Sequence, residues 1–279
     1  MTLPEVTVVI PTYNRAWSLP RAIDSVLEQT VPAKDIIIVD DGSTDHTAEQ
    51  LKNYGKKIRT LTQAQQGVSA ARNTGIKNSN TDWIAFLDSD DAWHPKKLAE
   101  QIKRAIEEDR QIVHTNEVWL KNNVFINQKK IHKKQGGWIF QQCLPLCAIS
   151  PSSVLIHRCI LDTCGYFDES LPACEDYDLW LRITCRYPVA FCTQALTIKH
   201  GGHDDQLSQR FAAMDRFRIL ALSRLLDSNV LNQQQRLHTL NTLEKKLKIY
   251  INGARKRKKY TEVQPYLAIK NKYQAEFSG

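Results

Sequence analysis

Three carboxylates stand within the run Asp88-Ser89-Asp90-Asp91, which directly follows the apolar run Trp83-Ile84-Ala85-Phe86-Leu87. Carboxylates this close repel one another unless positive charge, hydrogen-bond donors or solvent lie between them. Hard divalent cations take oxygen ligands of this kind and commonly share them with substrate phosphates. The run therefore predicts a site for Mn²⁺ or Mg²⁺ built from Asp88, Asp90 and Asp91, and a solvated acidic turn is the alternative.

A second acidic group, Glu175-Asp176-Tyr177-Asp178, stands where a helix over residues 176–187 is predicted to begin. The helix macrodipole favours carboxylates at this end, so helix stability alone could explain them. Glu175 and Asp178 lie three residues apart and share a helix face, whereas Asp176 projects in another direction. Asp176 is therefore the candidate to face a cleft.

Four further polar segments follow predicted strands or begin predicted helices. They are Pro11-Thr12-Tyr13-Asn14-Arg15, Asp40-Asp41-Gly42-Ser43-Thr44-Asp45, Gln66-Gly67-Val68-Ser69-Ala70-Ala71-Arg72-Asn73 and His200-Gly201-Gly202-His203-Asp204-Asp205. Each has a structural alternative: a plain loop, a turn with a helix cap, helix packing with a surface cation, and an ordinary loop histidine. Capping explains one or two residues of the second segment but not the whole set.

Short β-branched runs alternate with helical patterns over the first 120 residues, which is typical of a parallel sheet wrapped by helices. The runs that predict strands are Val6–Ile10, Asp35–Val39, Ile58–Leu61 and Trp83–Leu87. Pro95 is expected in the first turn of a helix that continues through Ile106. Ligands of such sheets bind outside the carboxyl ends of the strands, which is where the polar segments stand.

The second half of the chain is less regular. Residues 122–137 are rich in Asn, Lys and Gln and predict an exposed excursion, after which Ser152–His157 predicts a strand. Nearly everything after Gln206 has helical spacing, and the final segment predicts a hairpin of helices broken near Gly253.

The composition is that of a globular protein, with 279 residues of which 42% are hydrophobic, enough for one large core. The net charge of +8 is confined to the tail: from residue 232 onward 11 Lys+Arg face 3 Asp+Glu, and the rest of the chain holds 27 of each. Seven cysteines without zinc-knuckle or redox spacing predict reduced, packed thiols. With no visible secretion signal and no apolar run of about 18 residues, we expect a cytoplasmic protein with at most peripheral contact at the inner face of the membrane.

Taken in order, these segments resemble the inverting family 2 glycosyltransferases over about residues 5 to 210. The resemblance implies an α/β fold of the GT-A type, a Rossmann-like and mostly parallel sheet flanked by helices, with a C-terminal helical extension. It divides the chain into a GT-A domain over residues 1–205 and a basic helical extension over 206–279. Within the first domain, 1–120 would be the nucleotide-binding half and 121–205 the acceptor half.

The resemblance also assigns roles to individual residues. Those implied beside the nucleotide or its phosphates are Pro11, Thr12, Tyr13, Asn14, Arg15, Asp41, Gly67, Arg72, Asp88 and Ser89. Asp41 would read the edge of the base, usually uracil. Asp88 and Asp90 match the family's Asp-x-Asp pair, with Asp90 the direct ligand of Mn²⁺ or Mg²⁺ and Asp91 sharing that role. His200 stands where many members carry a late histidine near the metal or diphosphate, although the double glycine that follows it is less usual.

The implied reaction is a single displacement that inverts the anomeric centre. A bound metal neutralises charge developing on the leaving diphosphate, and a positioned carboxylate accepts the proton of the attacking hydroxyl. Asp176 matches the family's base, with Glu175 beside it. The expected enzyme is a hexosyl- or hexosaminyltransferase that uses a nucleoside diphosphate sugar, with UDP as the expected nucleotide, and a glycan or lipid-linked acceptor.

The basic run Arg255-Lys256-Arg257-Lys258-Lys259 is either a solvated helical face or a contact for anionic lipid headgroups or a lipid-diphosphate acceptor. A nucleic-acid-binding protein is an alternative that the high pI suggests. It is not expected, because the carboxylates at the strand ends repel phosphates unless a metal intervenes. A nucleotidyltransferase of related fold, a metal-dependent phosphatase and an inactive sugar-nucleotide sensor also stay open, although a phosphatase has no use for the second acidic group.

Overall fold

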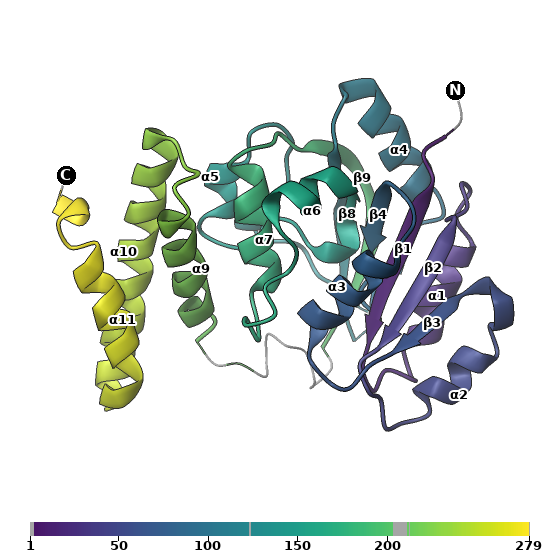
Figure 1. The fold of residues 1–279 in the computed structure, drawn as a ribbon, viewed down its shortest axis with the longest axis horizontal. Helices are drawn as coiled ribbons and strands as arrows, with labels where there is room; N and C mark the ends of the chain where they lie inside the picture. The colour runs from purple at the N-terminus through teal and green to yellow at the C-terminus, as the bar shows by residue number, and fades with distance from the viewer. Residues whose placement is uncertain (1–2, 123, 203–210, 212, 279) are drawn as a thin grey trace.

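One mixed sheet lies at the centre of the protein (Figure 1). The structure, a computed structural model, describes residues 3–122, 124–202, 211 and 213–278. The strands are β1 Val6–Thr12, β2 Asp35–Asp40, β3 Arg59–Thr62, β4 Trp83–Phe86, β5 Ala92–Trp93, β6 Ile112–Lys121, β7 Val124–Phe125, β8 Val154–His157 and β9 Ala190–Gly201. Their order is β3-β2-β1-β4-β8-β6-β9-β5, with β7 paired to β6. The pairings give β1, β2, β3, β4, β6 and β9 one direction, while β5, β7 and β8 oppose them.

The predicted α/β class, with a mostly parallel sheet, flanking helices and a C-terminal helical extension, is therefore confirmed. All four strands predicted for the first half are present, each within two residues of its predicted ends. They form the parallel part of the sheet, β3-β2-β1-β4. Their near-continuous apolar runs match burial on both faces, as expected for parallel strands covered by helices.

Alternate residues of β1 and β2 serve two different cores. Val8 and Ile36 pack with helices α1 (Leu19–Leu27) and α4 (Lys97–Glu108). Val9 and Ile37 face the opposite layer, which holds α3 (Val68–Asn78), α6 (Arg158–Cys164) and α7 (Glu175–Thr184). This alternation follows from the period of two along a strand. Helices therefore cover both faces and leave the strand ends open for a site.

A glycine in α3 and a proline before α4 each affect how these helices fit the sheet. Helix α3 approaches β1 so closely that a Cβ on Gly75 would lie 2.3 Å from Val9 Cγ1, so only glycine fits there. Pro95 does not lie in the first turn of α4 as predicted, because the helix begins at Lys97 with Lys96 as its N-cap. Proline instead sits just before the helix, where its missing N–H costs no intrahelical bond.

The second half of the chain adds strands to the same sheet rather than forming a separate body. β8 inserts between β4 and β6 and runs antiparallel to both. The strand predicted from residue 152 begins at Val154, because Pro151–Ser153 form a 3₁₀ turn. β6 then pairs along its length with β9, with register shifts around Asn116. The boundary expected at residue 120 consequently falls inside β6.

Within its described residues, the C-terminal extension has three helices: α9 (Asp215–Asp227), α10 (Gln233–Lys256) and α11 (Tyr260–Lys272). Figure 1 shows α10 and α11 side by side at the end of the molecule away from β1 and β2. The predicted hairpin of helices is present, but α10 continues through Gly253 to Lys256, so the break lies about one turn beyond the predicted position. The chain turns at residues 257–259, where Lys258 has a φ of 57°. The domain boundary expected between residues 205 and 206 lies outside the described residues.

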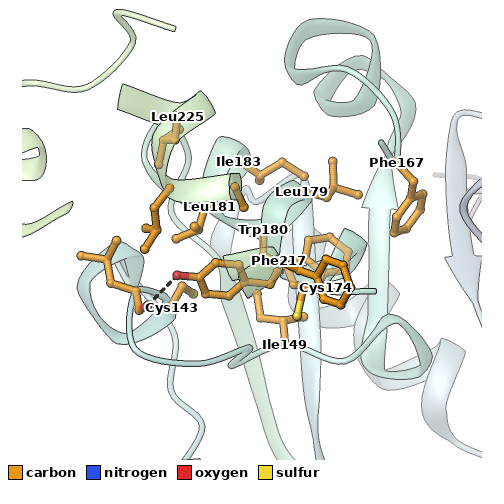
Figure 2. Close-up of a cluster of buried hydrophobic side chains, with 14 of the residues drawn as sticks. Cys143, Ile149, Phe167, Cys174, Leu179, Trp180, Leu181, Ile183, Phe217 and Leu225 are labelled. Atoms are coloured by element: carbon orange, nitrogen blue, oxygen red, sulfur yellow. Dashed lines mark hydrogen bonds between the residues drawn. The ribbon is translucent and has the colours of Figure 1, made fainter. Parts of the chain in front are cut away.

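The extension shares the main core. Figure 2 shows Leu179, Leu181 and Ile183 of α7 packed in one cluster with Phe217 and Leu225 of α9. Eight of the ten residues of α7 are buried, although four of the ten are charged. Buried surroundings on all sides hold its N-terminal residues in fixed positions.

The remaining short elements connect these parts. They are α2 Thr47–Lys52, α5 Phe140–Cys143 and the 3₁₀ turns Gly55–Lys57, Lys130–His132 and Glu276–Ser278. All seven cysteines are free thiols and five of them are buried, as predicted. Among the residues that the structure describes, no helix is both long and apolar enough to cross a membrane.

Candidate active site

One cleft of about 1140 Å³ lies at the carboxyl ends of β1, β2 and β4. All of the predicted site residues border it: Pro11, Thr12, Tyr13, Asn14, Arg15, Asp41, Gly67, Arg72, Asp88, Ser89, Asp90, Asp91, Glu175, Asp176 and His200. The fold thus brings together segments that are distant in sequence. A space of this size accommodates a nucleotide-sized ligand. The individual roles of these residues stay predictions.

The loops after β1 and β2 are bound to each other. Asn14 has a φ of 51°, a conformation that asparagine tolerates better than most residues. Its backbone N–H donates to Ser43 Oγ at 2.9 Å, and its Oδ1 accepts from Thr44 N at 2.7 Å. Gly42 has a φ of 80°, and a Cβ there would lie 3.2 Å from Gln65 N. Glycine therefore suits this position, both for its positive φ and for the close approach of the loop after β2 to residues 63–65, which follow β3.

Asp41 organises the segment that leads into α3. Its buried carboxylate accepts hydrogen bonds from Gln63 Nε2 at 2.8 Å, Gln66 N at 2.9 Å and Gly67 N at 2.8 Å. Oδ1 takes two of these bonds and Oδ2 takes one. Asp41 thus fixes the wall of the cleft between β2 and α3, and Oδ2 keeps acceptor capacity.

Arg72 joins the two acidic groups. Its Nη2 lies 2.7 Å from Asp88 Oδ1 and its Nη1 lies 2.7 Å from Glu175 Oε1. The side chain is 4% exposed, so the pair of salt bridges is screened little by solvent. Burial acts against it, but Asp88 and Glu175 raise the pKa of Arg72, and the guanidinium stays charged. Burial, followed by the charge of Asp176, raises the pKa of Glu175 despite the contact with Arg72.

Lys199 is a second cation in the cleft, and no motif of the sequence indicated it. Its Nζ lies 3.3 Å from Asp91 Oδ2 and 3.9 Å from Asp88 Oδ2. Although burial opposes them, these two carboxylates raise the pKa of Lys199. Burial would raise the pKa of Asp88, but Arg72 and Lys199 more than offset it, so the pKa lies below its ordinary value. The protein itself therefore supplies part of the positive charge that the acidic run requires.

The three carboxylates of the acidic run have different surroundings. Asp91 is buried: Oδ2 accepts from Ser152 Oγ at 2.6 Å and Oδ1 accepts from His200 N at 3.1 Å. Burial raises the pKa of Asp91 to about 7, although Lys199 acts in the opposite direction. Asp90 is half-buried and borders the cleft. Asp91 is thus engaged by protein groups on both oxygens, which fits a positioning role better than metal ligation.

Asp88 and Asp90 fit a metal of the Mg²⁺ type, which binds to one or two carboxylates and completes its shell with water and substrate phosphates. They do not fit an all-protein cage: within the described ranges, no three His, Cys, Asp or Glu side chains lie close enough to hold a metal. His200 is half-buried in β9 and borders the cleft. The rest of its predicted motif, His203-Asp204-Asp205, lies outside the described residues.

Asp176 stands in the first turn of α7 and is half-buried. Its Oδ1 accepts from Tyr177 N at 2.7 Å, and its Oδ2 accepts from the Cys147 thiol at 3.2 Å. Burial, followed by the charge of Asp176, raises the pKa of Cys147, so the thiol keeps its proton and remains a donor. This contact joins residues 29 apart, and no spacing in the sequence signalled it.

Three buried polar atoms along the cleft lack a hydrogen-bond partner within the part of the chain that the structure describes. They are Thr12 Oγ1, Ser69 Oγ and Arg72 Nε. Buried polar groups are nearly always satisfied, by protein, water or ligand. All three residues line the cleft, so unpaired polar atoms lie directly beneath its wall.

A family model and several curated relatives that match this chain are those of glycosyltransferases. The model of glycosyl transferase family 2 matches residues 7–149. The UDP-Glc:alpha-D-GlcNAc-diphosphoundecaprenol beta-1,3-glucosyltransferase WfgD of Escherichia coli is 31% identical over 180 residues, which cover 64% of this chain and 69% of the relative. An uncharacterized glycosyltransferase of Rickettsia bellii is 32% identical over 235 residues, covering 75% of this chain and 31% of the relative. The chain spans about a third of the length of the first curated relatives it matches.

The fold is also that of a solved structure. A crystal structure of S. aureus TarS, residues 1–349 in complex with UDP-GlcNAc, matches with a TM-score of 0.70 and 18% identity, covering 87% of this chain and 71% of that one. The same protein has been solved with UDP, and that structure matches with a TM-score of 0.64.

Proposed function

Because the chain belongs to glycosyl transferase family 2, we propose that it transfers a sugar from a nucleoside diphosphate sugar to a hydroxyl of a glycan or lipid-linked acceptor. The expected donor is a UDP-hexose or UDP-N-acetylhexosamine. The expected outcome is inversion in a single displacement. The family match argues against the nucleic-acid-binding alternative.

The observation that carries the proposal is the cleft, where two acidic groups and three unsatisfied polar atoms meet. A donor there would bring a diphosphate, which needs positive charge, and a sugar, which needs hydrogen-bond partners. Thr12, Ser69 and Arg72 line the cleft, and their unpaired polar atoms lie just beneath its surface. Named relatives support the class of donor, since WfgD takes UDP-Glc and TarS binds UDP-GlcNAc.

The nucleotide is assigned to the side of the cleft bordered by residues 11–15, Asp41 and Gly67. Asp41 Oδ2 would accept from an N–H of the base while its other bonds hold the wall of the cleft. Ser89 lies between the metal-binding carboxylates and lines the same space. Lys199, which already neutralises Asp88 and Asp91, would add attraction for the diphosphate.

Asp90, with Asp88 beside it, would hold Mn²⁺ or Mg²⁺ against the diphosphate. A metal bound there stabilises the negative charge that develops on the leaving group. Asp91 and His200 are assigned to positioning, because the Asp91 carboxylate accepts the N–H of His200 and fixes the end of β9 against the acidic run.

Asp176 is proposed as the general base. Its carboxylate stands in the first turn of α7 and borders the cleft, where it could accept the proton of an acceptor hydroxyl. The Cys147 thiol and the Tyr177 N–H each bind one oxygen and hold the carboxylate in one orientation. Glu175 is engaged by Arg72 and would act by fixing the start of the helix.

Residues 121–205, the expected acceptor half, do not by themselves identify the acceptor. WfgD acts on a diphosphoundecaprenol-linked sugar, which supports a lipid-linked acceptor. The basic tail, residues 255–259, is exposed and would contact anionic headgroups, each basic residue near such a surface contributing about 1 kcal/mol. Replacing these five residues with Gln and measuring sedimentation with anionic vesicles tests this contact, and unchanged binding would refute it.

A thermal-shift panel of nucleoside diphosphates and their sugars, with and without Mn²⁺, tests the proposed donor. UDP and UDP-sugars are expected to raise the melting temperature only with metal present. Asp90→Ala should lose the metal-dependent part of this shift. Asp82→Ala is the matched control, because Asp82 is an exposed acid outside the cleft and its loss should change nothing. A full shift in Asp90→Ala would remove Asp90 from the metal site.

A further inference from the structure

Residues 121–138, which we call the arm, expose most of their apolar side chains, whereas Gln128 and Lys134 contact the body of the protein. Val124, Phe125, Ile126, Ile131 and Trp138 are between 42% and 76% exposed. They are five of the twelve large hydrophobic residues that the described part of the chain exposes. An exposed apolar group of this kind marks a surface that binds another partner.

The polar residues of the arm bind it to the body of the protein. Lys134 Nζ lies 3.1 Å from Glu117 Oε1 and donates to Ala148 O at 2.9 Å. Gln128 Nε2 donates to Glu117 O at 2.8 Å, and the Ile126 N–H donates to Trp119 O at 2.9 Å. The arm is therefore held in a defined position by hydrogen bonds and an ion pair rather than by its apolar residues. Its apolar residues remain available to a partner.

The charge of the arm indicates the chemistry of that partner. The segment has five lysines and no Asp or Glu. Lys121, Lys129, Lys130 and Lys133 are exposed on the same segment as the apolar side chains. A second copy of the chain would bring the same positive charge and be repelled. Apolar side chains beside exposed lysines suit the boundary between acyl chains and anionic headgroups, where lysine stems lie along apolar surface and their ammonium groups stay in water.

We propose that the arm docks the protein on a membrane with anionic headgroups and holds the cleft beside that surface. β6 carries the arm at its end and pairs Trp119 with Lys199 and Leu120 with His200, and both partners border the cleft. An inserted arm would therefore hold the cleft near the headgroups. Docking goes beyond the proposed transfer reaction and needs neither donor nor acceptor, so the two can fail independently.

Vesicle flotation with the full chain tests the arm. The wild type is expected to float with phosphatidylcholine vesicles that contain phosphatidylglycerol and to stay behind with phosphatidylcholine alone. Val124→Ser/Phe125→Ser/Ile126→Ser should weaken binding about tenfold or more, since burying these side chains supplies the apolar part of the affinity. Lys129→Gln/Lys130→Gln/Lys133→Gln should reduce the preference for anionic vesicles and the sensitivity to salt, and should remove them when combined with the five-Gln tail.

Two controls separate the arm from other effects. Ile106→Ser removes an equally exposed apolar residue from α4 and should bind vesicles like the wild type. The five-Gln variant of the tail, residues 255–259, should still respond to the serine changes in the arm. Phe125→Ser alone serves if the triple variant melts at a lower temperature than the wild type. The proposal is overturned if the wild type binds no anionic vesicles, if the serine variants bind unchanged, or if they instead lose self-association or nucleic-acid binding.

Discussion

Glu117 and Lys134, at the foot of the arm, form a buried ion pair, as Arg72 forms with Asp88 and Glu175 at the cleft. At the arm the acid is fully engaged. Glu117 Oε1 accepts from Lys134 and Ser150, and Oε2 accepts from Trp119 Nε1 at 2.8 Å. Each buried charge of this cluster has its partners within the protein, which is the condition for a buried ion pair to be tolerated.

The cluster at the cleft is built from the same kinds of groups but is left incomplete. Arg72 Nε, Thr12 Oγ1 and Ser69 Oγ have no partner within the described residues. Glu175 and Asp91 both have raised pKa values, because burial outweighs the neighbouring cations. The two clusters therefore differ: the protein provides partners for both charges of the Glu117–Lys134 pair, whereas the cluster at the cleft keeps unpaired polar atoms beside a ligand-sized space.

The largest effect is expected at the cleft, from Asp176→Asn. The amide cannot accept the acceptor's proton, so the transfer rate should fall about a thousandfold. Donor binding, measured by the thermal shift with UDP and Mn²⁺, should stay near the wild type. Asp109→Asn is the control, since Asp109 is an exposed acid in a left-handed conformation that asparagine also tolerates. Transfer by Asp176→Asn close to that of the control would exclude Asp176 as the base.

At the arm, Lys134→Met should lower the free energy of unfolding and leave the transfer rate of the folded protein unchanged. The change leaves Glu117 buried without its cation, which costs about 3–5 kcal/mol. Urea unfolding monitored by circular dichroism measures this loss. Lys133→Met is the neighbouring control, because Lys133 is exposed and should contribute little. Equal stabilities of the two variants would show that the Glu117 pair does not hold the arm in place.

The same ion pair predicts an acid dependence of stability. Burial would raise the pKa of Glu117, but Lys134 and the other neighbours lower it from 4.5 to about 2. The folded state therefore gains stability above the unfolded pKa and loses it as the pH falls from about 4.5 to about 2. The amount is about 3 kcal/mol. Glu117→Gln should flatten the slope of unfolding free energy against pH in this window, because the unfolded state then takes up about one proton fewer relative to the folded state. An unchanged slope would contradict the lowered pKa of Glu117.

The sequence predicted the rim of the cleft better than its interior. Acidic and polar residues directly after strands must gather at one edge of the sheet, so their meeting followed from local pattern. The Arg72–Glu175 contact joins residues 103 apart, and no local signal revealed it. Lys199 is a single lysine inside a strand, whose alternating pattern does not mark a half-buried cation that faces a cleft.

The arm and the final helices were harder for a different reason. The composition of residues 122–137 correctly predicted exposure, but not that Lys134 and Gln128 would point inward while Phe125 points outward. That choice depends on Glu117, which lies in β6 outside the segment. Likewise Gly253 does not end α10, because glycine only weakens a helix interior and packing of the neighbouring helices can override it.

The smallest effect is expected from Cys147→Ala. It removes one hydrogen bond to Asp176 Oδ2 and should reduce the transfer rate a few-fold, since such a bond contributes about 1 kcal/mol. Cys147→Ser keeps a donor and should recover most of the rate. The KM for the donor should be the same in both variants. Equal rates of the alanine variant and the wild type would remove the thiol from the positioning of Asp176.

A crystal structure of the protein with UDP and Mn²⁺ tests the central claim most directly. We expect the nucleotide in the cleft, with its diphosphate and the metal at Asp90 and with polar partners among Thr12, Ser69 and Arg72. The cluster at Glu117 and Lys134 should be unchanged. Nucleotide bound elsewhere, or a cleft that stays without ligand while its polar atoms pair with one another, would contradict the account.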